Sequence, residues 1–173
     1  MDWEMTSEEL EKIVIDFMDH FNTMVLACCQ DGEPWSAPVY YARQGFDLIF
    51  FSSRKSLHSR IFLRNPRVAS SICGHYERWQ DIKGLQLSGN VEALTTVISL
   101  ARAANIYFKR YPFANDFFSK AGFLSEALAK ETRIILYAFR SETIHYLENS
   151  AGFGVRWKLE IKDGHSVGLP VKS

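Results

Sequence analysis

The segment from residue 52 to residue 60 concentrates the side chains that bind phosphate best. It holds four serine hydroxyls, three formal cations and one histidine within nine residues, as Ser52, Ser53, Arg54, Lys55, Ser56, His58, Ser59 and Arg60. The segment follows an apolar run and leads into a short helix, whose first turn adds unpaired N–H groups and a partial positive charge. A phosphate monoester requires several donors and about two units of positive charge. The pattern indicates either a phosphate-binding loop or a solvated, positively charged turn.

Other chemistry-bearing patterns are missing from the sequence. It contains no G-x-S-x-G, P-loop or H-E-x-x-H motif, and Gly152-Phe153-Gly154 lacks the third glycine of a dinucleotide fingerprint. The histidines are widely scattered, at His20, His58, His75, His145 and His165. Cys28, Cys29 and Cys73 form no C-x-x-C pair, which indicates reduced thiols. The sequence predicts no metal site, and no catalytic acid or base stands out.

The composition is that of a folded, soluble domain. The 173 residues include 20 Lys plus Arg and 20 Asp plus Glu, so the formal net charge is zero, and 47% are apolar. These values exclude intrinsic disorder and argue against the basic footprint of nucleic-acid binding. No apolar run approaches the ~20 residues of a membrane span, and residues 1–5 lack the character of a signal peptide. We expect one cytoplasmic domain that binds neither nucleic acid nor membrane.

The elements that must position the serine-rich segment follow from the hydrophobic period. Thr6 and Glu9 have the spacing of a capping box. They precede a helix whose apolar stripe comprises Leu10, Ile13, Val14, Phe17, Met18 and Phe21. Apolar runs at 23–29, 35–42 and 47–52, joined by tight turns, predict an antiparallel meander. Pro38 places the second of these strands at an edge or a bulge.

The rest of the chain alternates between helix and strand signals. A loop and short helix end before Asn65-Pro66, and a strand at 68–73 is followed by one at 85–94 that bends at Gly89. A helix at 95–109 is ended by Pro112, and its predicted buried stripe is Val97, Leu100, Ala101, Ala104 and Phe108. Further predicted elements are a helical piece from Phe113 through Phe117 and Phe118 to Gly122, strands at 132–139, 143–147 and 155–161, and a loop at 149–154.

Three stretches together resemble the pyridoxamine 5'-phosphate oxidase-like FMN-binding split-barrel family. They are Trp35-Ser36-Ala37-Pro38-Val39-Tyr40-Tyr41, Phe50-Phe51-Ser52-Ser53 and Asn65-Pro66-Arg67-Val68-Ala69. The order and spacing of the elements over residues 23–94 match that family. The C-terminal half is similar to one small branch of it, through Leu100-Ala101-Arg102-Ala103, Arg110-Tyr111-Pro112 and a loop ending in Gly152-Phe153-Gly154.

The resemblance implies a mainly β (α+β) fold, an antiparallel Greek-key split β-barrel with an N-terminal helix and inserted helices. A single domain is expected over residues 1–173. Its parts would be an N-terminal helix (1–22), a barrel core (23–94), a helical insertion (95–130), closing strands (131–161) and a polar tail (162–173).

The resemblance also implies that FMN is held at a homodimer interface. The implied cofactor-binding residues are Pro38, Val39, Tyr40, Tyr41, Phe51, Ser52, Ser53, Lys55, Ser56, Leu57 and His58. The Arg-Lys pair of the oxidase motif falls here on Leu57 and His58. Leu57 cannot bind phosphate through its side chain, and His58 is mostly neutral at pH 7 when unperturbed. Arg54, Lys55 and Ser56 would supply what is lost.

The implied activity is that of an FMN-dependent oxidoreductase whose substrate and electron donor are unknown. The substrate-phosphate arginines and the Arg-x-His-x-Arg ending of the oxidases have no counterpart here, so oxidation of pyridoxamine phosphate is not expected. A haem-binding or haem-handling protein is the alternative, with His58 or His75 as an axial ligand. A ligand-free dimer of the same fold is a third possibility.

Two aromatic groups are open to two interpretations each. Phe113, Phe117, Phe118 and Phe123 are typical of packing under helices, or of a lid over a planar ligand. Phe153 lies between two glycines, either in a plain turn or on a loop that places it against a ring, and Trp79 shares this ambiguity.

Overall fold

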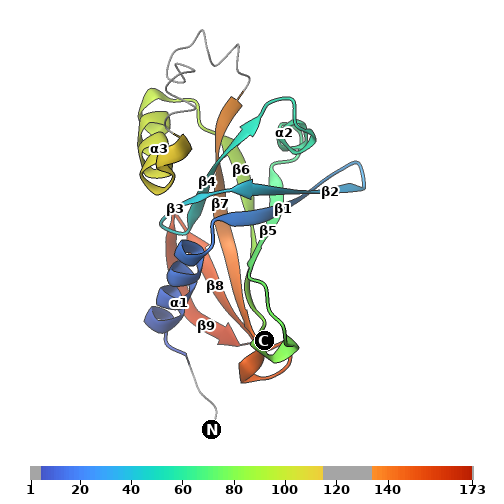
Figure 1. Ribbon diagram of the computed structural model, residues 1–173, viewed down its shortest axis with the longest axis vertical. Coiled ribbons are helices and arrows are strands. Elements are labelled where there is room, and N and C mark those ends of the chain that lie inside the picture. The colour runs from blue at the N-terminus through green and yellow to red at the C-terminus, as the bar shows by residue number, and fades with distance from the viewer. Residues whose placement is uncertain (1–4, 115–133, 173) are drawn as a thin grey trace.

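A computed structural model describes residues 5–114 and 134–172, which form one curled antiparallel sheet with few helices (Figure 1). The elements are α1 (Ser7–His20), β1 (Thr23–Gln30), β2 (Glu33–Tyr40), β3 (Ala42–Gln44), β4 (Asp47–Ser53), α2 (Leu57–Phe62), β5 (Arg67–Cys73), η1 (Trp79–Asp81), β6 (Lys83–Ala93), α3 (Val97–Arg110), β7 (Ile134–Glu148), η2 (Asn149–Ala151), β8 (Arg156–Lys162) and β9 (His165–Lys172). The strands are ordered β2-β1-β5-β6-β7-β4-β3, with β8 on β7 and β9 on β8. The predicted split-barrel class is confirmed.

The barrel divides along β7. Residues 134–139 of this strand pair with β4, whereas residues 143–147 pair with β8. Ser141 lies between the two halves, where its N–H donates to Asp47 Oδ1 (3.2 Å) and its hydroxyl donates to the Phe46 carbonyl (2.6 Å). The prediction of two separate strands is therefore wrong. The polar residues that suggested a break have partners on neighbouring strands, so the strand continues through them.

A sharp corner at Tyr41 separates β2 from β3. β2 pairs with β1, and β3 pairs with β4, so the predicted strand 35–42 does not continue as one strand of a meander. Tyr41 donates its N–H to the Asn22 carbonyl (3.1 Å), and its fully buried side chain donates its hydroxyl to the Met18 carbonyl (2.7 Å). The edge position predicted from Pro38 is confirmed, because β2 is the terminal strand on its side of the sheet.

The C-terminal segment forms a strand rather than the expected polar tail. β9 pairs with β8 after a turn at Asp163-Gly164, where both residues have positive φ. Ser7 Oγ donates to the Gly168 carbonyl (3.3 Å), and Ser166 Oγ donates to the carboxylate of Glu11. Val167, Leu169 and Val171 alternate along β9, but all three side chains are exposed, so the strand is held by β8 and α1 rather than by core packing.

The two longer helices begin close to the predicted positions, and α3 buries its predicted stripe in part. Thr6 and Glu9 form the predicted capping box of α1. In α3, which begins after the cap Thr96, the buried residues are Ala103, Ala104 and Tyr107, whereas Val97 is 83% exposed. Of the predicted stripe, Ala104 is buried and Leu100 and Phe108 pack against the same core cluster, whereas Val97 and Ala101 are exposed. The prediction missed Ala103 and Tyr107, which also face the sheet. Within the described residues, no helix combines the length and apolar character needed to cross a membrane.

Several predicted features lie outside the described residues. They are the helical piece beyond Ala114, the aromatic residues Phe117, Phe118 and Phe123, and the first residues of the strand expected to begin at 132.

The interior of the barrel holds one buried hydroxyl without a partner. Ser70 on β5 is 5% exposed, and its Oγ makes no hydrogen bond within the described residues. Ser70 itself pairs with Leu26 on β1 and with Leu87 on β6, which places the hydroxyl at an apolar position. A buried polar group left unpaired costs free energy that an apolar group of similar shape avoids.

We therefore expect Ser70→Ala to raise the free energy of unfolding by about 1 kcal/mol. Urea denaturation followed by circular dichroism would measure the change. Ser71→Ala is the matched control, because Ser71 faces the other side of the same strand and should change stability by less than about 0.5 kcal/mol. A clear loss of stability in Ser70→Ala would show that its hydroxyl has a partner after all.

Candidate functional site

The serine-rich segment folds into a polar cluster between β4 and α2. Ser56 caps α2 and accepts a hydrogen bond from the Ser59 N–H (3.3 Å). Ser56 Oγ lies 3.1 Å from Ser52 Oγ and 2.9 Å from Ser59 Oγ, and Ser59 Oγ lies 3.3 Å from Ser52 Oγ. Three hydroxyls from positions spread over the segment therefore converge on one point.

His58 completes this cluster. Its Nε2 lies 2.5 Å from Ser52 Oγ and 3.0 Å from Ser56 Oγ, and its ring packs 5.6 Å from the ring of Phe62. Burial lowers the pKa of His58 below its usual value, so the imidazole is neutral at neutral pH. Hydroxyls can rotate and a neutral imidazole has one donor and one acceptor, so the group can turn several donors toward an anion.

The charged side chains of the segment are exposed and take no part in the hydrogen bonds of the cluster. Arg54, Lys55 and Arg60 are exposed, and none of them belongs to an ion pair within residues 5–114 and 134–172. Leu57 is 39% exposed at the first position of α2. Ser53 serves the turn itself, since its Oγ accepts from the Lys55 N–H (3.2 Å) and its carbonyl accepts from Ser56 Oγ (2.8 Å).

The predicted cofactor strand presents different faces along its length. On β2, Pro38 is exposed, Val39 is half-buried against the core, and Tyr40 is 49% exposed. Tyr41 is fully buried, so its side chain cannot touch a ligand. Phe51 on β4 points under α3, where its ring contacts Tyr107 and Phe108 at 4.7 and 5.9 Å between centroids. Of the predicted set, the structure joins Ser52, Ser53, Ser56 and His58 through side-chain hydrogen bonds, and Lys55 joins them through its N–H alone.

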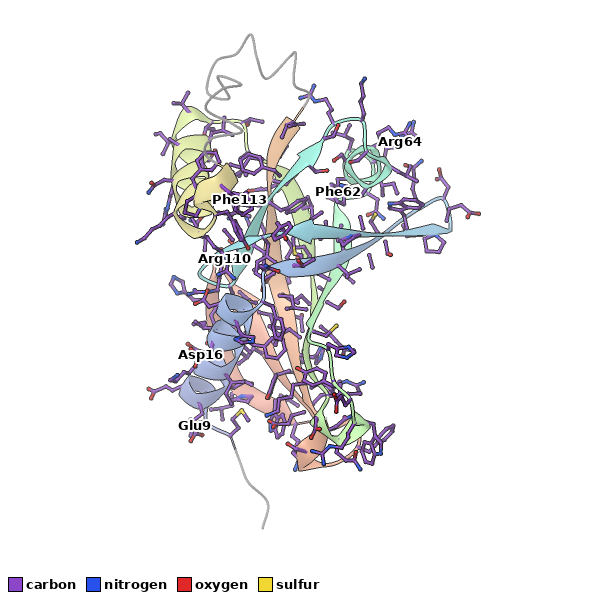
Figure 2. The ribbon with its side chains drawn as sticks, in the orientation of Figure 1. Glu9, Asp16, Phe62, Arg64, Arg110 and Phe113 are labelled. Carbon is purple, nitrogen blue, oxygen red and sulfur yellow. The ribbon has the colours of Figure 1, made fainter. Side chains whose placement is uncertain are left out.

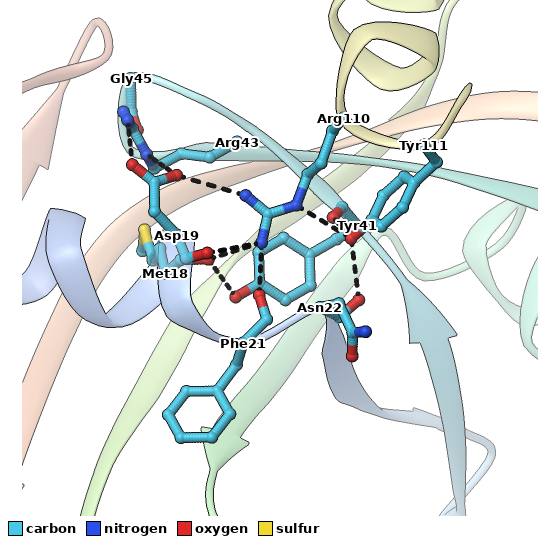
Figure 3. Close-up of polar contacts among 9 residues, drawn as sticks. All are labelled: Met18, Asp19, Phe21, Asn22, Tyr41, Arg43, Gly45, Arg110 and Tyr111. Atoms are coloured by element: carbon cyan, nitrogen blue, oxygen red, sulfur yellow. Dashed lines mark hydrogen bonds and ion pairs between the residues drawn. The ribbon is translucent and has the colours of Figure 1, made fainter. Parts of the chain in front are cut away.

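A second group of residues fixes the corner beside Tyr40 (Figure 3). The Tyr111 hydroxyl donates to the Tyr41 carbonyl (2.6 Å) and accepts from Arg110 Nε (3.0 Å). Arg110 Nη2 also donates to the carbonyls of Asp19 (3.0 Å) and Phe21 (2.6 Å) at the end of α1. These bonds tie the end of α3 to the corner between β2 and β3 and to the end of α1.

Aromatic rings cover the outer side of this corner. The ring of Tyr40 lies 5.6 Å from that of Tyr111 and 6.4 Å from that of Phe113, measured between centroids. The Phe113 ring, which is 67% exposed, lies 5.8 Å from Tyr111. Figure 2 places Phe113 on the α3 side of β4, and Phe62 with Arg64 on the α2 side.

The two ambiguous aromatics of the sequence meet far from this region. Trp79 and Phe153 are 51% and 84% exposed, and their rings make an edge contact at 5.5 Å. Asn149 holds both loops, because its Nδ2 donates to the Trp79 carbonyl (2.8 Å) and its Oδ1 accepts from the Gly154 N–H (3.1 Å). These loops lie at the end of the sheet opposite α2 (Figure 1).

Sequence reasoning left three residues out of the predicted site. Ser59 was counted in the segment, but only the structure shows that it is buried and bonded to Ser52 and Ser56. Arg110 and Tyr111 were noted only as part of a stretch that resembles the family. Their hydrogen-bond partners lie about 70 to 90 positions away in the chain, so the sequence did not indicate their role. Among the described residues, no group of three His, Cys, Asp or Glu could hold a metal ion, and His75 is exposed.

Comparison with known proteins finds one group of similar sequences and another of similar structures. A UPF0306 protein of Haemophilus ducreyi is 34% identical over 86 residues, which are 46% of this chain and 57% of that protein. A heme binding protein from Mycobacterium smegmatis shares the fold at 17% identity and a TM-score of 0.62, over 85% of this chain and 57% of that one. An FAD-binding protein from Mesorhizobium loti does so at 21% identity and a TM-score of 0.60, over 81% of this chain and 94% of that one.

The chain thus spans little more than half the length of the first two of these proteins. The family model described as pyridoxamine 5'-phosphate oxidase matches residues 10–135. Because that match covers most of the chain, the protein is a member of the pyridoxamine 5'-phosphate oxidase family.

Proposed function

We propose that this protein is an FMN-binding flavoprotein and an oxidoreductase, with a substrate other than pyridoxamine phosphate. The observation that carries the proposal is the convergence of Ser52, Ser56 and Ser59 hydroxyls with His58 Nε2 at the end of β4. A phosphate monoester is the ligand that such a set of small donors suits best. The family membership supports a flavin over other phosphate esters.

Each part of the site has a distinct task in this proposal. The serine hydroxyls would donate to phosphate oxygens, and Arg54 and Lys55 would balance the charge from the exposed side of the loop. β2 is a terminal strand, so part of its main chain is free of strand partners in the described sheet and would meet the polar edge of the ring system. FMN, when bound, supplies the redox chemistry, and the chain supplies position, charge and shelter from water.

The proposal includes a homodimer. Along the centre of the sheet, Val25 pairs with Ser71 and Ala27 pairs with Ala69. Val25, Ala27 and Ala69 are exposed, which is unusual for apolar side chains at the middle of a sheet. An exposed apolar face on two strands inside the sheet is suited to self-association through a two-fold axis. Size-exclusion chromatography with light scattering should give twice the chain mass, and a monomer at all concentrations would contradict the dimer.

The first experiment is a visible absorbance scan of protein purified without added cofactor, followed by an FMN titration. We expect saturable binding of FMN and much weaker binding of riboflavin, because riboflavin lacks the phosphate. Ser52→Ala combined with Ser56→Ala should weaken FMN binding about a hundredfold, since each of the two lost charge-assisted hydrogen bonds is worth roughly 1.5 kcal/mol. Equal affinity for FMN and riboflavin, or no flavin binding, would overturn the assignment.

FMN affinity should rise as the pH falls from about 8 to about 6.5. His58 is neutral in the free protein because burial lowers its pKa, and a bound phosphate dianion would raise that pKa again. Binding would therefore take up a proton, and the affinity gains at most about tenfold per pH unit. Titrations at several pH values check this. His58→Gln should bind FMN with no such pH dependence, and riboflavin is the ligand control.

A haem-binding protein is the second candidate, because one structural neighbour is named a heme binding protein. Its axial ligand would be His75, whose side chain is exposed, rather than His58, whose Nε2 is engaged by two hydroxyls. A Soret band that is lost in His75→Ala would favour this candidate over the flavin. Absence of saturable binding to both cofactors would leave a ligand-free dimer of the same fold.

A further inference from the structure

Two aromatic side chains stand exposed on a fixed base at the corner of β2 and β3. Tyr40 is 49% exposed and Phe113 is 67% exposed, and their rings lie 6.4 Å apart at an interplanar angle of 75°. Both rings rest on the buried ring of Tyr111, at 5.6 and 5.8 Å. Single exposed aromatics are common on protein surfaces, but a paired, supported set is typical of a surface that binds another ring.

The base holds these rings in place without relying on their contact with each other. Tyr111 donates its hydroxyl to the carbonyl of Tyr41, the residue next to Tyr40, over 2.6 Å. Phe113 follows Tyr111 by two residues, and Arg110 fastens the same turn to the end of α1 (Figure 3). The spacing of Tyr40 and Phe113 is therefore set before any ligand arrives, so little ordering is required on binding.

The chemistry of this surface selects the class of ligand. Tyr40, Tyr111 and Phe113 carry no formal charge, and the Arg110 guanidinium is already engaged by Tyr111, Asp19 and Phe21. Among these three residues and Arg110, an anion would find one exposed neutral hydroxyl, that of Tyr40, against the three hydroxyls of the serine cluster. A planar, uncharged, conjugated ring would gain edge and stacking contacts, which an alicyclic compound of the same size cannot make as well.

We infer that Tyr40 and Phe113 form an aromatic wall that binds a planar aromatic reactant beside the cofactor, with Tyr111 as its positioning residue. Phe113 lies on the α3 side of β4 and Phe62 of α2 lies on the other side (Figure 2). The strand that carries Tyr40, β2, contacts both β4 and α2, which carry the serine cluster. The inference rests on the proposed function for the cofactor itself, but the wall is assigned from its own contacts.

The test uses menadione, a compact uncharged quinone, as the planar probe and camphor as the alicyclic control. Both are titrated into FMN-loaded protein and into cofactor-free protein, and binding is followed by NMR line shifts. We expect saturable menadione binding, weaker binding of camphor, and a loss of about tenfold in menadione affinity in Phe113→Ala and in Tyr40→Ala. Leu63→Ala, at another exposed apolar side chain, should leave the affinity unchanged.

Tyr111→Phe keeps the ring of the positioning residue and removes its hydroxyl. We expect it to weaken menadione binding several-fold at a temperature well below its unfolding midpoint, while the affinity for FMN is retained. A purely structural role would lower the midpoint alone.

The possible failures are separable. If FMN binds and menadione affinity is the same in wild type, Phe113→Ala and Tyr40→Ala, the wall is overturned and the flavin site remains. If FMN does not bind but menadione affinity depends on Phe113, the flavin assignment falls and the wall stands. If neither compound binds saturably, both are overturned.

Discussion

Replacing Arg110 with alanine is expected to lower the free energy of unfolding by about 3 kcal/mol. The guanidinium donates to the carbonyls of Phe21 and Asp19 at 2.6 and 3.0 Å, and it forms an ion pair with the Asp19 carboxylate at 3.4 Å. Its side chain is only 22% exposed. Hydrogen bonds involving a charged group contribute roughly 1.5–3 kcal/mol each, and partial exposure of Asp19 reduces the sum.

The same change removes contacts that are not ionic. The guanidinium carbon lies 5.7 Å from the centre of the Tyr41 ring and 5.6 Å from that of the Tyr111 ring. The last carbonyls of a helix have no N–H partner from a following turn, and here Arg110 is their donor. Its loss would leave the carbonyls at the end of α1 without that hydrogen bond. The pKa of Asp19 is lowered chiefly by its hydrogen bond with Arg43, so this carboxylate stays paired and ionised when Arg110 is lost.

Urea denaturation and thermal melting would measure the effect, and a loss of this size shifts the melting temperature by roughly 6 to 12 °C. Arg102→Ala is the matched control, because Arg102 is an exposed arginine of the same helix that forms no ion pair in the described part of the chain. Arg110→Lys should recover part of the loss, since lysine keeps the charge but not the fork of donors. Similar losses in Arg102→Ala and Arg110→Ala would show that the network contributes little.

Local signals predicted those elements whose cause is local. The capping box of Thr6 and Glu9, the edge position of Pro38 and the turn at Asp163-Gly164 each depend on residues within a few positions of one another. The split-barrel class rested on the resemblance of three short stretches, and of the order of the elements over residues 23–94, to a known family. The serine-rich segment was recognised from local sequence, because all its donors lie in one short stretch.

The features that the sequence did not reveal depend on partners far away in the chain. The corner at Tyr41 is fixed by Tyr111, 70 positions away, and by Met18, 23 positions away. The strand β7 continues through Ser141 because Phe46 and Asp47 supply its partners, 94 to 95 positions away. The spacing of apolar residues carries no information about such bonds. The polar residues around Ser141 were therefore mistaken for the end of a strand, and the sequence did not show that Tyr40 is half-exposed while Tyr41 is buried.

Gly89→Ala is expected to be the most damaging single methyl addition in the sheet. A Cβ at this position would lie 1.9 Å from the Arg140 carbonyl oxygen and 2.9 Å from its carbonyl carbon. Real carbon atoms do not approach backbone atoms so closely, so one of the two strands would have to move. Gly89 also marks the register shift between β6 and β7, which brings Ser141 to the point where the barrel divides.

The opposing strand is poorly able to give way at this point. Arg140 is bonded to Asp47 at 2.7 Å and to Glu92 at 2.6 Å, and the Ser141 hydroxyl is bonded to the Phe46 carbonyl at 2.6 Å. Relief of the clash would therefore break ladder bonds and side-chain bonds together. We expect a loss of about 4 kcal/mol or more in the free energy of unfolding, or failure to fold.

Gly84→Ala is the control that separates the clash from a general cost of alanine in β6. It adds the same methyl group to the same strand, where the nearest atom would be the Ile72 carbonyl oxygen at 3.2 Å, a contact that small shifts relieve. Urea denaturation should therefore give a loss at least twice as large for Gly89→Ala as for Gly84→Ala. Comparable losses would mean that β7 can move away from Gly89. In that case the register shift, and with it the placement of Ser141 between β4 and β8, would depend on the bonds of Arg140 rather than on the absence of a side chain.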